Sequence, residues 1–461
     1  MKSRKLYKGL VYSLCALCIF ASFFLISCGS TAGIEEASHG TVEDFTRKEL
    51  SNGIPVIFKQ NRGSKIVVMR VIFEGGTSSI DKSVSGLEGL TLDLALRGSD
   101  KYPYSNIQQL EYEKSFSLYS SSGKDYAVAG FTCIQRDMAE VLSIFSDCIL
   151  NPSMSESDFS QKMTEAAEFI ARNKSDPSGA LGLAISKAAF ADHPYETGSS
   201  ITEDSYPNIN LTLVKGLQQS LLNALRIKIV VVGNFSNDLI ENFTKELEGY
   251  FGSLPRKAFS LPKIPKISVP SGKVVKLANE QAGDTGYVAG LFECPSKTAD
   301  DYIPFALVSM YLDDLYFSQV REKAGAVYSI NTGIMGGKEL LAVISAYRVS
   351  GKEHLKQLIS DAILSFDANV FYKKLDQYKN RYISTIFNSS QTAAGLASSV
   401  ISSLEYFDSE SAYLQRADAV RAVDMQQIVA AYKKYFEPVA KENAAQWIIV
   451  DGENNLQQYD F

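Results

Sequence analysis

Histidine is scarce in this chain: its 461 residues include only His39, His193 and His354. Catalytic zinc sites usually take imidazole ligands, and a pair on one helix lies three or four residues apart. No two of these histidines have that spacing. A site made only of carboxylates favours magnesium or calcium over the zinc that polarises a peptide bond. The sequence therefore predicts that the chain holds no catalytic zinc and no other cofactor of its own.

Cysteines are few and unevenly placed. Two lie in the apolar N-terminal run and a third ends it, so processing there would leave Cys133, Cys148 and Cys294 in the body of the chain. An odd, widely spaced set argues against a disulfide framework in an exported protein. Single buried thiols are the favoured interpretation, and one bridge among the three stays open.

The chain also has no excess of basic residues. Its formal charge is −6, and removal of residues 1–27 would take away four basic and no acidic side chains, leaving −10. An acidic surface repels phosphate groups, and no basic run remains beyond the N-terminus. The composition therefore argues against a nucleic-acid partner.

The N-terminus carries the pattern of a secretory signal. Basic residues precede an almost uninterrupted apolar run over residues 9–27, which ends in Leu-Ile-Ser-Cys28. These four residues resemble a bacterial lipobox, in which the cysteine is acylated and becomes the new N-terminus. We expect a lipoprotein signal peptide at 1–27, lipidation of Cys28, a tether at 28–44, and a membrane-anchored lipoprotein of the bacterial cell envelope facing the periplasm or exterior. The alternative is a retained membrane helix, because the run is about long enough to span a bilayer.

Beyond the tether, the chain divides into two halves. Residues 251–255, Phe-Gly-Ser-Leu-Pro, close the first half, and three prolines between 262 and 270 stiffen a connector. Chains of this length usually form two or more domains. We predict an N-terminal domain at 45–255, a linker at 256–271 and a C-terminal domain at 272–461.

Each half repeats one plan of strands, helices and strands. A β-rich stretch at 65–73 leads into a helical pattern, and residues 286–293 lead in the same way into a helix near 302–315. The apolar stretches 227–233 and 447–452 match each other near the ends of the halves. Such a pattern predicts an α+β fold in which helices pack on a mostly antiparallel sheet.

Two motifs within this plan are informative. Residues 86–93 read Gly-Leu-Glu-Gly-Leu-Thr-Leu-Asp, and residues 317–329 read Phe-Ser-Gln-Val-Arg-Glu-Lys-Ala-Gly-Ala-Val-Tyr-Ser. Together with the Asp-His-Pro-Tyr stretch at 192–195, they resemble the pitrilysin/insulinase-type zinc metallopeptidases, the mitochondrial processing peptidase among them. The resemblance extends from about residue 45 to 455. It implies two homologous halves that face each other as a clamshell.

The resemblance fails at the metal. The family's zinc helix carries His-x-x-Glu-His, and the three corresponding positions here hold Gly89, Leu92 and Asp93. The family's third ligand is a glutamate on a later helix, and its spacing leads to Phe169. The neighbouring Glu165 and Glu168 have suitable chemistry at other positions, since one residue turns a helical side chain by about 100°. We interpret both as solvated helix carboxylates and expect neither a metal site nor catalytic residues in this chain.

The second motif is intact. In the family, this Arg-Glu-Lys-x-Gly-x-x-Tyr element binds substrate, which implies that role for Arg321 and Tyr328. Gly325 between them predicts a helix that ends in a glycine turn before a strand begins, so both side chains could point into one cleft. The alternative is an arginine that satisfies helix-end carbonyls and a tyrosine that packs in the core. The Asp313-Asp314 pair departs from the glycines that the family often has just upstream.

Two functions remain open. The first is a non-catalytic, substrate-binding subunit of a heteromeric zinc metallopeptidase, in which a homologous partner supplies the zinc and both act on peptides or unfolded segments. The second is a peptide-binding or scaffold lipoprotein with no hydrolytic role. A neighbouring gene for a similar chain with an intact His-x-x-Glu-His motif would favour the first.

Overall fold

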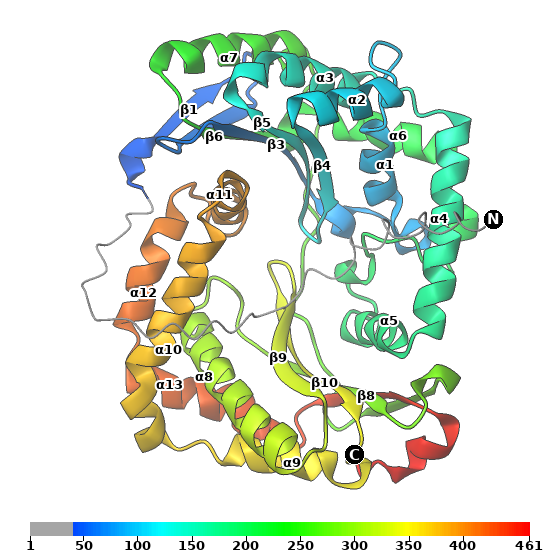
Figure 1. The fold of residues 1–461 in the computed structure, drawn as a ribbon, viewed down its shortest axis with the longest axis vertical. Coiled ribbons are helices and arrows are strands. Elements are labelled where there is room, and N and C mark those ends of the chain that lie inside the picture. Colours follow the sequence, from blue (N-terminus) through cyan, green and yellow to red (C-terminus); the bar gives the residue numbers. More distant parts are fainter. Residues whose placement is uncertain (1–39) are drawn as a thin grey trace, which may run out of the picture. The chain divides into compact units, whose positions relative to one another are not determined.

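Six strands form the sheet of the first half. In the computed structural model, which describes residues 40–461, they lie in the spatial order β1-β2-β6-β3-β5-β4 (Figure 1). Only β2 and β6 pair in parallel within this sheet. The bounds are β1 Phe45–Glu49, β2 Pro55–Gln60, β3 Ile66–Glu74, β4 Ser117–Ser122, β5 Tyr126–Ile134 and β6 Ile227–Gly233. The signal peptide at 1–27, Cys28, His39 and most of the tether lie outside the described residues.

The second half repeats this sheet. Its five strands lie in the order β7-β11-β8-β10-β9, and only β7 and β11 are parallel. Taken in sequence order, β2 to β6 of the first sheet correspond to β7 to β11 of the second. Corresponding strands occupy the same places across the two sheets, which confirms the predicted repeat. The bounds are β7 Val274–Ala278, β8 Gly286–Glu293, β9 Ser329–Gly336, β10 Leu340–Val349 and β11 Gln446–Asp451.

One face of each sheet carries a layer of helices and most of the core. On the first sheet these are α1 Leu87–Ala95, α2 Tyr104–Lys114, α3 Met138–Leu150, α6 Leu211–Leu221 and α7 Asn237–Phe251. On the second sheet they are α8 Tyr302–Leu315, the π-helical η9 Tyr316–Lys323, α9 Leu355–Leu364, α10 Ala368–Ser389, α13 Met425–Ala431 and α14 Glu437–Lys441. The predicted α+β fold, with helices on mostly antiparallel sheets, is confirmed.

The opposite face of each sheet is covered by a helix from the other half. Helix α11, Ala393–Phe407, places Leu396, Val400 and Leu404 against the first sheet. Helix α5, Pro177–Ala189, places Leu181 and Ile185 against the second. Because both faces of the central strands are therefore buried, β3 and β6 read as nearly continuous apolar runs. Helix α4, Glu156–Ser175, packs beside α5, and α12, Arg416–Ala422, packs beside α10.

Polar contacts also join the two halves, which face each other as a clamshell. Lys228 on β6 contacts Glu405 on α11 at 2.9 Å. The carboxylate of Asp125 accepts hydrogen bonds from the Tyr195 hydroxyl at 2.6 Å and from the backbone N–H of Lys338 at 2.7 Å. Lys338 lies in the β9–β10 turn of the second half, so Asp125 fixes that turn to the first.

Two further expectations concern cysteines and the membrane. Cys133, Cys148 and Cys294 are all free and buried, as predicted for single thiols, and burial raises the pKa of each to about 12. Among residues 40–461, no helix combines the length and the apolar character needed to cross a membrane.

Candidate functional site

Helix α1 carries the positions of the metal motif, and a backbone segment lies tightly against its start. Gly86 has φ +88° and donates its N–H to the Gly198 carbonyl at 3.1 Å. A Cβ on Gly89 would lie 2.7 Å from the carbonyl oxygen of Ser199. Real Cβ atoms do not approach backbone this closely, so a side chain at 89 would require the 198–201 segment to move.

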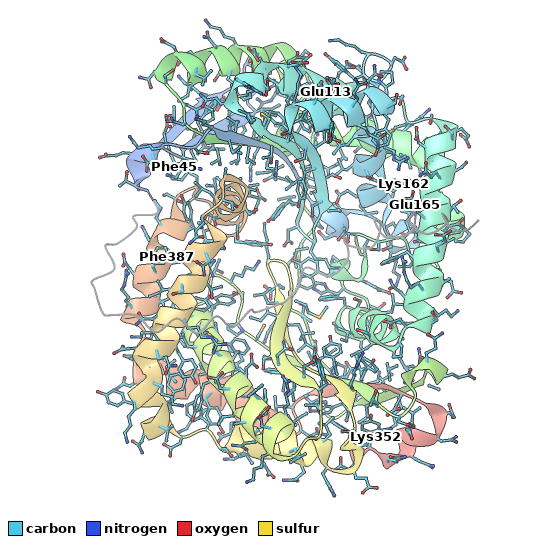
Figure 2. All side chains as sticks on the ribbon, viewed as in Figure 1. Phe45, Glu113, Lys162, Glu165, Lys352 and Phe387 are labelled. Carbon is cyan, nitrogen blue, oxygen red and sulfur yellow. The ribbon has the colours of Figure 1, made fainter. Side chains whose placement is uncertain are left out.

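The other two motif positions also have structural neighbours. Leu92 is 2% exposed and belongs to the core of the first half. Asp93 forms an ion pair with α4, where the Lys162 ammonium lies 2.7 Å from its carboxylate and 3.1 Å from that of Glu165. Figure 2 labels Lys162 and Glu165 on this helix. Burial lowers the pKa of Lys162, but the two carboxylates outweigh this and leave it raised. A fixed ammonium therefore lies between the two acidic groups at this place.

The remaining candidates on α4 point elsewhere. Phe169 lines a separate cavity of about 790 Å³ together with Ser85 and Ile201, and its ring lies 5.9 Å from the Arg172 guanidinium. Glu168 is exposed, as predicted for a solvated carboxylate. Glu165 is exposed as well, but the sequence did not reveal its ion pair with Lys162.

The residues at this position do not fit zinc. Gly89 and Leu92 offer no donor atom, and the Asp93 carboxylate already contacts an ammonium. Within residues 40–461, no group of three or more His, Cys, Asp or Glu side chains could hold a metal ion. His193 has a structural role, because its Nδ1 accepts the Tyr195 N–H at 3.0 Å and its Nε2 lies 2.9 Å from the Pro265 carbonyl.

Glu88 is a notable residue on α1 that sequence reasoning passed over. It is buried, one carboxylate oxygen accepts a hydrogen bond from the Ser122 hydroxyl, and the other has no hydrogen-bond partner among the described residues. Burial raises the pKa of this carboxyl to about 7, although Ser122 and the charge of Arg226 oppose the shift. The available signal was a lone acidic residue in the otherwise uncharged run from Gly86 to Leu92.

The second motif forms the predicted helix, glycine turn and strand. Helix α8 continues as η9 to Lys323, Gly325 adopts φ +59°, and β9 begins at Ser329. The left-handed conformation of Gly325 ends the helix at little cost, because glycine has no Cβ. Tyr328 follows three residues later and donates its N–H to Tyr347 on β10 at 3.1 Å.

Arg321 and Tyr328 lie together at an exposed place. The Arg321 guanidinium carbon lies 5.4 Å from the centre of the Tyr328 ring and 5.1 Å from that of Phe317. Arg348 approaches Tyr328 from β10 at 5.8 Å. Tyr328 is 64% exposed, so it is not the core tyrosine of the alternative. Within the described residues, the Arg321 side chain contacts aromatic rings and makes no hydrogen bond or ion pair. We call these four residues the Arg321–Tyr328 cluster.

The aspartates upstream of this cluster anchor it. Asp313 is half-buried, and its carboxylate accepts the backbone N–H of Thr332 on β9 at 2.7 Å. Burial raises the pKa of Asp313 to about 7, against the effect of the Thr332 hydrogen bonds. Asp314 accepts the Tyr378 hydroxyl at 2.6 Å and contacts Arg381 at 3.3 Å, which ties α8 to α10. The departure from glycine therefore adds contacts rather than disrupting the helix.

Both candidate regions lie beside a sheet edge. β4 is the last strand of the first sheet and packs near α1, while β9 is the last strand of the second and follows Tyr328. Among residues 40–461, each of these two strands pairs with one neighbour, so one row of its backbone N–H and C=O groups has no strand partner there. Such edges can take up an extended peptide.

Family models match both halves. Residues 55–202 match a model described as insulinase (peptidase family M16), and residues 208–382 match one described as the peptidase M16 inactive domain. A protein of Helicobacter pylori named non-peptidase homolog YmxG is 21% identical over 240 residues, which is 52% of this chain and 55% of that protein. The chain thus spans just over half the length of that relative.

Solved structures share the fold. A peptidase M16 inactive domain from Pseudomonas fluorescens superposes with a TM-score of 0.76 at 18% identity, over 88% of this chain and 98% of that chain. The periplasmic protease PqqL from Escherichia coli matches with a TM-score of 0.74 at 14% identity. That match covers 96% of this chain but 49% of PqqL, so the present fold corresponds to about half of the longer protein.

Proposed function

Because this chain belongs to the M16, insulinase-type peptidase family, we propose that it is a non-catalytic, substrate-binding subunit that acts with a zinc-bearing homologous subunit. One observation carries the proposal. The metal positions of α1 are occupied by structural contacts, whereas Tyr328 is exposed, Arg321 is half-buried beside it, and neither side chain donates a hydrogen bond to any of residues 40–461. Relatives and neighbours described as non-peptidase or inactive support a member without its own hydrolytic activity.

The length of PqqL supports a partner of the same fold. The present chain corresponds to about half of that protease, so a second module of similar size would complete an assembly of comparable extent. In a two-chain version, the partner would contribute the metal and this chain the Arg321–Tyr328 cluster. The exposure of the cluster is consistent with a role toward a group outside the chain.

The chemistry of the cluster fits peptide recognition. The Arg321 guanidinium has five N–H donors and none is engaged in a hydrogen bond to the described residues, so it can bind peptide carbonyls. The Tyr328 hydroxyl can donate to an oxygen on which negative charge develops during hydrolysis. Zinc in the partner would supply the Lewis acid that activates water. The free edge of β9 would hold the peptide extended beside both side chains.

Reconstitution tests this function. The chain is co-expressed with a candidate homologue that has an intact His-x-x-Glu-His motif, such as one from a neighbouring gene. We expect a stable complex with one zinc per two chains, carried by the partner, and peptidase activity in the complex above that of either chain alone. Failure of any zinc-bearing homologue to associate would instead support the scaffold or peptide-binding alternative.

The cellular location is part of the proposal. The Leu-Ile-Ser-Cys28 segment supports a lipid-anchored subunit at the bacterial cell envelope, facing the periplasm or exterior. Two or more acyl chains would anchor it firmly, because a single chain binds only marginally. We expect mass spectrometry to find an acylated N-terminus at Cys28, and Cys28→Ala to abolish both the modification and membrane fractionation. An unmodified N-terminus at another residue would contradict this.

A further inference from the structure

A second cavity lies at the opposite end of α8 from the Arg321–Tyr328 cluster. It has a volume of about 460 Å³ and lies between the start of α8, the end of α11 and helices α12 and α13. One part of its wall is apolar, with Tyr302, Ile303, Phe407 and Val423. Two basic side chains, Lys297 and Arg416, line the same cavity. We call it the Lys297–Arg416 pocket.

Lys297 forms no ion pair in the part of the chain that the structure describes, although the Asp125 carboxylate acts on it electrostatically. Its ammonium lies 3.8 Å from the centre of the Tyr406 ring, which is a cation–π contact rather than an ion pair. Burial lowers the pKa of Lys297 to about 8; Asp125 opposes this shift and the charge of Arg416 adds to it. No carboxylate among the described residues is in direct contact with this ammonium, and an anion bound there would stabilise its charge.

Arg416 is unpaired in the same sense. Its Nη2 donates to the Tyr382 hydroxyl at 3.4 Å, and among residues 40–461 it forms no ion pair. Arg421, five residues further along the same sequence segment, contacts the Asp418 carboxylate at 2.7 Å. Arginine is seldom left without a carboxylate at a partly buried position, because its planar fork suits a two-oxygen acceptor.

The charge balance of the pocket indicates the kind of ligand. Lys297 and Arg416 contribute two positive charges, and the one acidic residue in the lining is the exposed Asp300. The neighbouring Asp301 is engaged elsewhere, with Lys434 at 2.8 Å and the Tyr435 hydroxyl at 2.7 Å. The side chains that line the pocket therefore carry about one net positive charge, in a chain whose formal charge is −6. One charge next to an apolar wall suits a monoanion with an apolar body better than a doubly charged phosphate.

We propose that the Lys297–Arg416 pocket binds the carboxylate of a ligand with an apolar body, and that its source is the C-terminal residue of a peptide. The peptide source rests on the proposed function, whereas the carboxylate site itself does not. Arg416 would bind both carboxylate oxygens and Lys297 one of them, while Ile303, Phe407 and Val423 would contact the apolar side chain. A peptide held here by its end would be bound at a site separate from the Arg321–Tyr328 cluster.

Binding to the isolated chain tests this inference without any partner. The probe is a fluorescent pentapeptide, Gly-Ser-Gly-Ala-Leu, prepared with a free C-terminal carboxylate and as the C-terminal amide. We expect the acid to bind about ten-fold more tightly than the amide, as for the loss of one charge-assisted contact. Arg416→Gln and Lys297→Gln should each remove most of this difference. Arg421→Gln, on the same helix but outside the pocket, should preserve it. Equal binding of acid and amide would overturn the site.

Further variants and competitors distinguish a peptide from other anions and keep the test valid if the Gln variants misfold. If the Gln variants unfold, Arg416→Lys and Lys297→Arg keep the charge and should retain at least part of the preference for the acid; its complete loss in folded variants would contradict the assignment. N-acetyl-leucine competing as strongly as the peptide would assign the pocket to small carboxylic acids and overturn the peptide source. Inorganic phosphate competing as strongly as N-acetyl-leucine would overturn the carboxylate assignment. Because no partner is present, these outcomes are independent of whether the zinc-bearing complex forms.

Discussion

The α1 region and the Arg321–Tyr328 cluster contain the two sequence motifs that resemble the family, but their side chains have different surroundings. At α1, every motif position has an internal neighbour: Ser199 backbone at Gly89, the core at Leu92 and Lys162 at Asp93. At the cluster, Tyr328 is exposed, and among residues 40–461 the Arg321 side chain contacts aromatic rings without a hydrogen bond or ion pair. Side chains with internal partners serve the fold, whereas exposed groups with unused donors are available to a ligand. The comparison therefore separates a place whose side chains are used within the fold from one for which we propose a ligand-binding role.

The strongest test of this difference is to rebuild the metal motif in α1. We expect the triple variant Gly89→His, Leu92→Glu, Asp93→His to bind no zinc and to lose about 3 kcal/mol or more of its free energy of unfolding. The reasons are the contact of residue 89 with the Ser199 carbonyl and a carboxylate placed in the core at 92. Urea unfolding and elemental analysis measure both effects.

The control for this variant is Asp93→His alone, which alters a half-exposed side chain. It should change stability by less than about 1 kcal/mol. A triple variant that is stable and holds one zinc per chain would show that α1 remains an intact metal helix, contrary to the closed site described above.

The cluster is tested by removing its donors. In the complex with a zinc-bearing partner, we expect Arg321→Ala and Tyr328→Phe each to lower kcat/KM by about 100-fold, as for loss of one transition-state donor. Neither should change Tm or complex formation, because the side chains contribute little to the core. Arg47→Ala and Tyr372→Phe are exposed controls and should behave as the parent. Full activity in both cluster variants would assign Arg321 and Tyr328 a surface role only.

A smaller effect concerns Asp313, which anchors the cluster. Its pKa is raised from 3.8 to about 7 in the folded chain, so the folded state binds this proton more tightly than the unfolded state. Its contribution to stability is therefore present at low pH and is lost as pH rises from about 4 to 7. For one proton the slope is at most about 1.4 kcal/mol per pH unit. Asp313→Asn keeps the acceptor for Thr332 and should flatten this part of the stability curve.

Urea unfolding between pH 5 and 8 measures that slope. Glu88, in the first half, also has a pKa raised to about 7. Glu88→Gln should therefore remove the contribution of this carboxyl to the pH dependence of stability, and the double variant should remove the contributions of both groups. An Asp313→Asn variant with the same slope as the parent would mean that Asp313 is ionised throughout this range.

The smallest effect is expected at Lys162. The side chains of Asp93 and Glu165 are 46% and 47% exposed, so solvent screens their attraction to the ammonium. Lys162→Met should cost less than about 1 kcal/mol, and Lys162→Arg should cost still less. A loss well above 1 kcal/mol in the Met variant would show that this ion pair holds α1 and α4 together more strongly than its exposure suggests.

Local signals predicted much of the fold. The stretch 286–293 was identified as a strand and coincides with β8, and the helix near 302–315 coincides with α8. The glycine turn expected at Gly325 lies between η9 and β9, with φ +59°. These features depend on alternation, apolar spacing and turn chemistry over a few residues, which a single sequence displays directly.

The site required contacts between distant segments, which local patterns do not encode. Nothing in the sequence around Gly89 indicates that Ser199 lies against it. Counting along the chain led to Phe169, whereas the side chain that faces Asp93 is Lys162. The Lys297–Arg416 pocket joins residues more than a hundred positions apart, so no local sequence pattern predicts it.

The exchange of α5 and α11 between the sheets has a consequence for folding during synthesis. β6, the strand of the first sheet that comes last in the sequence, ends at Gly233. Helix α11, which covers the second face of this sheet, begins only at Ala393. Until the ribosome has added this later segment, one apolar face of the first sheet has no cover from α11. Contacts of such large sequence separation slow folding and prolong the time in which intermediates can aggregate. This chain should therefore depend on holding chaperones until its final hundred residues emerge, and isolated N-terminal halves should be poorly soluble.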